Sequence, residues 1–138
     1  MDKEAREMIN EHGFIIHYVF GYDFPLANCH THGLLENYGH LELQIVLAVP
    51  KEAIHGILWN LVDKIKQGKK FKDGDLIEDI IENLPLKAME VRKPNESLLR
   101  ILLPDPNGKF PDDKNCDPYY AKQTTDPITM EKGKGGCL

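Results

Sequence analysis

A short stretch of the sequence carries three of the chain's six histidines, His30, His32 and His40, together with the carboxylate of Glu42. Imidazole nitrogens and carboxylate oxygens are groups that proteins use to bind zinc, iron, manganese or nickel. His30 and His32 are two residues apart, so on a β-strand their side chains point to the same face. The stretch is therefore a candidate metal or ligand site if it forms strands.

The residues that follow have the alternation of a half-buried strand. Leucine or isoleucine occupies every odd position from Leu41 to Leu47, and such a period of two places the odd positions toward a core. The even positions, which include Glu42 and Gln44, then lie on the opposite, polar face.

We expect two strands to form a hairpin whose turn is centred on Glu36. In that register His32 lies opposite His40, and His30 lies opposite Glu42. Directly opposite residues have Cβ atoms about 5 Å apart, which is close enough for their side chains to share a metal. A slip of one residue would move His40 and Glu42 to the other face, so the prediction depends on the register.

The hairpin predicts a divalent metal site formed by His30, His32, His40 and Glu42. Such a site would hold zinc, iron or manganese and keep an open position for water or a substrate, so hydrolysis is the reaction that it would support. The same face could instead form a metal-free polar pocket for a small ligand. Its candidate contacts are Thr31, His32, His40, Glu42 and Gln44. No catalytic residue is assigned, and the sequence leaves open whether the protein is an enzyme.

Other residues capable of chemistry are interpreted as structural. His17 lies in an apolar strand and His55 on the flank of a helix, so neither is expected to be a ligand. Cys29 adjoins His30, but neighbours on a strand point to opposite faces, which favours a small buried residue at Cys29. The three cysteines of the chain include no Cys-x-x-Cys pair, which is typical of reduced thiols.

Composition narrows the class of protein. The chain has 138 residues, 41% of them hydrophobic and 28% charged, with a net charge of −5. This is typical of a globular domain, which we place over residues 1–120, followed by a flexible tail over residues 121–138. No basic face indicates nucleic-acid binding, and no apolar run is long enough to span a membrane. We therefore expect a cytoplasmic protein.

Periodicity predicts the order of the elements. Apolar spacing indicates helices over residues 4–12, 50–67 and 75–84, the last with a capping box formed by Asp75 and Glu78. Strands are expected over residues 14–20, on both sides of the turn at Glu36, and over residues 86–91 and 98–103. This order favours an α+β fold in which two to three helices pack on one face of a mainly antiparallel sheet.

The segment from Thr31 to Leu47, with the proline-started helix after it, resembles the bacterial DUF4262 family. The matching positions of the family pattern are Thr31, Gly33, Leu34, His40 and Leu43, and towards the C-terminus Gly108, Phe110 and Pro111. The resemblance covers about residues 13–117. It implies a small α+β protein and supplies no activity. Because His40 belongs to the family pattern, the resemblance makes His40 the strongest single site candidate.

A second class of function fits the same sequence. Small size, acidic charge and the lack of familiar catalytic motifs also suit an interaction module, such as an immunity-type or regulatory protein that binds another protein. Its contacts would be the acidic turn over residues 112–117 and the C-terminal tail. We expect a small ligand or a protein as partner, and the sequence does not fix the oligomeric state.

Overall fold

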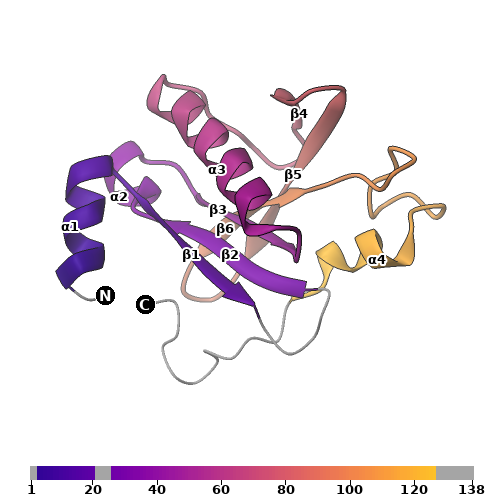
Figure 1. Cartoon of the computed structure of the whole chain (residues 1–138), viewed down its shortest axis with the longest axis horizontal. Coiled ribbons are helices and arrows are strands. Elements are labelled where there is room, and N and C mark those ends of the chain that lie inside the picture. The colour runs from indigo at the N-terminus through magenta and orange to yellow at the C-terminus, as the bar shows by residue number, and fades with distance from the viewer. Residues whose placement is uncertain (1–2, 21–25, 127–138) are drawn as a thin grey trace.

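The structure is a computed structural model, and it describes residues 3–20 and 26–126. Six strands form one sheet, and helices flank it (Figure 1). The strands are β1 (Ile15–Phe20), β2 (Leu26–His32), β3 (Glu42–Leu47), β4 (Leu76–Ile81), β5 (Leu84–Arg92) and β6 (Ser97–Leu102). The helices are α1 (Lys3–His12), α2 (Leu34–Tyr38), α3 (Lys51–Lys66), α4 (Pro118–Ala121) and the 3-10 turn η1 (Lys122–Thr124).

The sheet consists of two antiparallel halves joined in parallel. Its strand order is β1-β2-β3-β6-β5-β4, and β3 and β6 are the parallel pair at the centre. The long helix α3 follows β3 and begins the crossover that returns the chain to the other half (Figure 1). The predicted α+β class is confirmed, and the sheet is mixed because of this central pair.

The main core lies between α3 and one face of the sheet. The apolar stripe of α3, from Ile54 to Ile65, belongs to the same buried cluster as Leu43, Ile45 and Leu47 of β3. The alternation predicted for β3 is thus confirmed. Helix α1 contributes to a separate small cluster, formed by Ala5, Ile9 and Ile15.

The helix predicted over residues 75–84 is wrong, because these residues form β4 and the turn into β5. Ile77, Ile80 and Ile81 have helical spacing, but β-branched residues favour a strand. Two residues of this segment have a left-handed backbone conformation. Asp79 has φ 69° beside an irregularity in the β4–β5 pairing, and Asn83 has φ 60° in the turn. Asparagine and aspartate tolerate this left-handed conformation better than most residues.

The first residues of the predicted tail pack on the fold. Gln123 is completely buried, and its side chain accepts a hydrogen bond from the Leu103 N–H and donates to the carbonyl oxygens of Leu103 and Tyr120. Residues 122–126 are therefore docked on the fold. The rest of the predicted tail, residues 127–138, lies outside the described residues. Within the described ranges, no helix is long and apolar enough to cross a membrane.

The loop after β6 is organised by one buried carboxylate. Asp105 is 1% exposed, and its oxygens accept hydrogen bonds from the N–H groups of Asn107, Lys109 and Asp117 at 2.8–2.9 Å. These bonds, that from Asp117 foremost, hold the pKa of Asp105 below its usual value.

We predict that Asp105→Asn lowers the free energy of unfolding, because an amide NH₂ would face an N–H donor. A carboxyl with a lowered folded-state pKa stabilises fully above its unfolded pKa of about 3.9 and loses that stabilisation as the pH falls through the folded value. Urea denaturation at neutral and acidic pH should therefore show a variant deficit that shrinks in acid. Asp112→Asn, at an exposed carboxylate, is the control. Equal midpoints for Asp105→Asn and wild type at neutral pH would contradict the prediction.

Candidate metal centre

A row of polar side chains crosses the sheet on the face opposite α3. Backbone pairing aligns His17 of β1 with His30 of β2, His30 with Gln44 of β3, and Gln44 with Arg100 of β6. Directly paired residues project to the same face. Four consecutive strands thus place imidazole, imidazole, amide and guanidinium side by side.

Three histidines gather at the β1–β2 end of this row. Potential ligand atoms of His17, His30 and His32 all lie within 4.8 Å of one another. Their ring centroids are 5.5 Å apart for His17 and His30, 4.5 Å for His17 and His32, and 5.0 Å for His30 and His32. His30 is 5% exposed. In the described part of the chain, this is the cluster whose geometry could hold a metal ion.

The electrostatic state of His32 favours a neutral ring. Burial lowers its pKa, and the negative charges of Glu42 and Glu96 oppose this effect only in part. Its Nε2 atom is buried and has no hydrogen-bond partner among the described residues. A neutral imidazole with an available lone pair is the form that binds metal ions.

The predicted pairing of β2 with β3 is wrong by two residues. His30 lies opposite Gln44 and not opposite Glu42, because the connection contains the short helix α2 in place of a tight turn. The shift is even, so His30 and Gln44 still share the polar face as predicted. It moves Glu42 away from its predicted place opposite His30, and His40 lies before the start of β3.

His40 is held by the backbone. Its Nδ1 donates to the Leu41 carbonyl at 2.7 Å, and its Nε2 accepts the N–H of Phe71 at 3.0 Å. The Phe71 N–H can only donate, so Nδ1 must carry the proton. Both ring nitrogens are thus occupied, and the ring links the start of β3 to the segment after α3.

Glu42 is also placed in a structural role. Its carboxylate accepts hydrogen bonds from the N–H groups of Gly33, Leu34 and Leu35 at the start of α2. It also accepts the hydroxyl of Thr31 at 2.7 Å, and that hydroxyl in turn accepts the N–H of Leu43. Thr31 and Glu42 therefore connect α2 to β3. The Glu42 carboxylate is not among the grouped ligand atoms of the three histidines, although its charge acts on His32.

His17 is the member of the cluster that sequence reasoning missed. Its place in an apolar strand favours a structural residue, and the structure instead sets it among the three histidines. The available signal is the turn-rich segment between the first two strands: a hairpin centred between residues 23 and 24 pairs His17 with His30, as observed. Residues 21–25 themselves lie outside the described residues.

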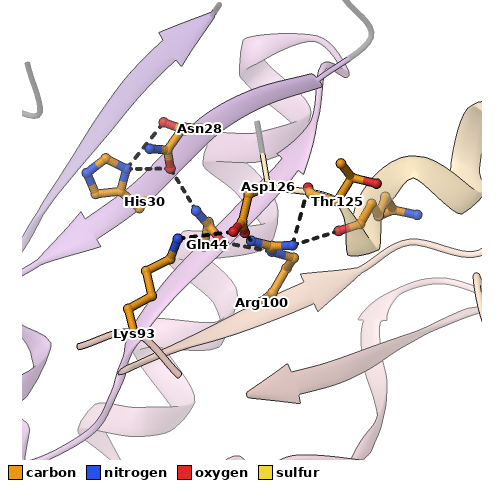
Figure 2. A network of polar contacts seen from close by, with 8 residues as sticks. Asn28, His30, Gln44, Lys93, Arg100, Thr125 and Asp126 are labelled. Carbon is orange, nitrogen blue, oxygen red and sulfur yellow. Dashed lines mark hydrogen bonds and ion pairs between the residues drawn. The ribbon is translucent and has the colours of Figure 1, made fainter. Parts of the chain in front are cut away.

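A chain of hydrogen bonds runs along the polar row from Arg100 to His30 (Figure 2). Arg100 Nε donates to Gln44 Oε1 at 2.8 Å, and Gln44 Nε2 donates to Asn28 Oδ1 at 2.9 Å. Nδ1 of His30 lies 3.0 Å from the same Asn28 Oδ1 and 3.2 Å from the Asn28 carbonyl oxygen. The histidine cluster is thus supported by side chains of three further positions on the sheet.

A pocket of about 170 Å³ opens beside His30. Asn28, His30 and Gln44 line it from the sheet, and Lys93, Glu96 and Asp126 line it from the surrounding segments. Its size and polar walls suit water or a small polar molecule. Of the predicted ligand-binding residues, Gln44 therefore lies at this pocket.

We predict that His40→Ala lowers the free energy of unfolding by roughly 1–3 kcal/mol, because it leaves the buried N–H of Phe71 without its acceptor. Chemical denaturation followed by circular dichroism measures the change. His55→Ala removes an exposed histidine and should alter stability much less. Equal stability of the two variants would show that the His40 bonds do not stabilise the fold.

The chain matches one family of known proteins. No curated protein and no solved structure matches the chain. Residues 8–117 match the family DUF4262, described as a domain of unknown function, and this segment contains the three histidines, Asn28, Gln44 and Arg100. The chain therefore belongs to the DUF4262 family.

Proposed function

We propose that His17, His30 and His32 bind a divalent metal ion, with zinc, iron and manganese as the candidates. The observation that carries the proposal is the convergence of three imidazoles whose ligand atoms lie within 4.8 Å of one another on two paired strands. Three histidine ligands are a donor set that proteins use for catalytic zinc, where the fourth position stays open for water or substrate.

The surroundings support a reactive site more than a closed structural one. Structural zinc sites have four protein ligands. Among the described residues, the group of ligand atoms within 4.8 Å of one another has only the three histidines as members. A pocket for a small polar molecule also borders His30, on the side of the ring that faces Asn28. A metal with an open position activates water or polarises a carbonyl, so hydrolysis of a small polar substrate is the reaction class that we propose.

We predict near-stoichiometric metal in protein purified without a histidine tag and dialysed against zinc, iron or manganese in turn. His17→Ala, His30→Ala and His32→Ala should each reduce the bound metal strongly, since each removes one of three ligands. Elemental analysis measures the metal, and circular dichroism checks that each variant is folded.

His55→Ala is the matched control, because it removes an exposed histidine outside the cluster. It should retain the metal of the wild type. Wild-type protein without metal in all three dialyses, or undiminished metal in the His17, His30 and His32 variants, would refute the proposed site.

A further inference from the structure

The buried guanidinium of Arg100 determines which way its neighbours are oriented. Arg100 is 1% exposed, and arginine has hydrogen-bond donors but no acceptor. The Gln44 atom that faces Arg100 Nε must therefore be the carbonyl oxygen Oε1, as observed at 2.8 Å. This leaves the NH₂ group of Gln44 directed at Asn28.

The orientation of Gln44 in turn determines that of Asn28 and the position of the ring proton on His30. An NH₂ group needs an acceptor, so the Asn28 atom facing Gln44 must be Oδ1. That oxygen also lies 3.0 Å from Nδ1 of His30, and the Asn28 carbonyl oxygen lies 3.2 Å from the same nitrogen. Two acceptors face Nδ1, so Nδ1 must carry the ring proton, and the lone pair of the neutral ring is on Nε2.

We infer that Arg100 is a positioning residue, which acts through Gln44 and Asn28 to fix His30 in the tautomer whose Nε2 binds the metal. The tautomer is a property of the chain itself, and its consequence for metal binding rests on the function proposed above. Metal-binding histidines characteristically donate their other N–H to a fixed acceptor, and loss of that acceptor costs about 10–100-fold in affinity.

Arg100 is itself fixed by the segment that follows α4. Its Nη1 donates to the carbonyl oxygens of Gln123 at 3.0 Å and Thr125 at 3.4 Å, and its Nη2 donates to Asp126 Oδ1 at 2.9 Å. Figure 2 shows Gln44, Thr125 and Asp126 arranged around the guanidinium. The docked segment 122–126 thus holds the first member of the chain of hydrogen bonds that ends at His30.

Two amide-to-carboxylate substitutions of nearly identical shape separate this account from simple electrostatics. In Gln44→Glu both side-chain oxygens only accept, so Asn28 must turn its NH₂ toward the new carboxylate and toward His30. Nδ1 then faces the NH₂ group of Asn28 at the shorter distance and the Asn28 carbonyl oxygen at the longer one. We expect Nδ1 to accept from the NH₂ group, so that the proton moves to Nε2. In Asn28→Asp the carboxylate still accepts from both Gln44 and His30, so the original tautomer is kept.

The direct test is the two-bond ¹H–¹⁵N correlation spectrum of the histidine rings in metal-free protein above about pH 7.5, where a histidine of ordinary pKa is neutral, with His30 assigned by comparison with His30→Gln. We expect Nδ1–H in the wild type and in Asn28→Asp, and Nε2–H in Gln44→Glu. Nε2–H in the wild type, or Nδ1–H in folded Gln44→Glu, would overturn the inference. The wild-type spectrum decides it even if a variant fails to fold.

Zinc titration against a chromophoric chelator gives the second readout. Gln44→Glu should weaken zinc binding about 10–100-fold although it adds a negative charge near the site, whereas Asn28→Asp should bind zinc at least as tightly as the wild type. Tighter zinc binding by both variants would show that charge alone matters and would overturn the positioning role. If no form binds zinc while the tautomers are as expected, the proposed metal function fails and the orientation of His30 stands.

Discussion

The arrangement of the polar face depends on one energetic requirement. The buried guanidinium of Arg100, at the centre of the sheet, needs hydrogen-bond acceptors and a negative charge. A buried charge is costly unless it is paired and fully hydrogen-bonded. Arg100 is 1% exposed on β6 and meets this requirement with the Gln44 carbonyl oxygen, two backbone carbonyl oxygens and the Asp126 carboxylate. The same bond with Arg100 holds the pKa of Asp126 below its usual value, so the carboxylate stays charged opposite the arginine.

This requirement links distant parts of the chain to the histidines. The parallel pairing of β3 with β6 sets Gln44 beside Arg100, and the antiparallel pairing of β2 with β3 sets His30 beside Gln44. The two halves of the sheet and the segment after α4 therefore all contribute to one site. An isolated hairpin of β1 and β2 would keep Asn28 but would lack Gln44 and Arg100, which orient the Asn28 amide.

Much of the architecture was predictable because it follows from local patterns. Helices α1 and α3, the alternation of β3, and the shared face of His30 and Gln44 all follow from the period of apolar residues. The isoleucines after residue 75 have helical spacing, and the pairing of β4 with β5 overrides it.

Which residues form the site was less predictable, because this depends on how the strands pair. Helix α2 replaces a tight turn and moves His40 and Glu42 into structural roles. His17 joins the cluster only through the pairing of β1 with β2, and the role of Arg100 depends on a contact between residues far apart in the chain. The turn-rich segment before β2 is a signal for the first contact, whereas composition and spacing carry no information about the contact of Arg100 with Gln44.

The most direct measurement of the central claim is anomalous diffraction at the zinc edge from crystals of the full chain grown with zinc chloride. Our account predicts a peak at bonding distance, about 2.0–2.1 Å, from ring nitrogens of His17, His30 and His32, with His30 bound through Nε2. A metal bound elsewhere with this cluster empty, or His30 bound through Nδ1, would contradict it.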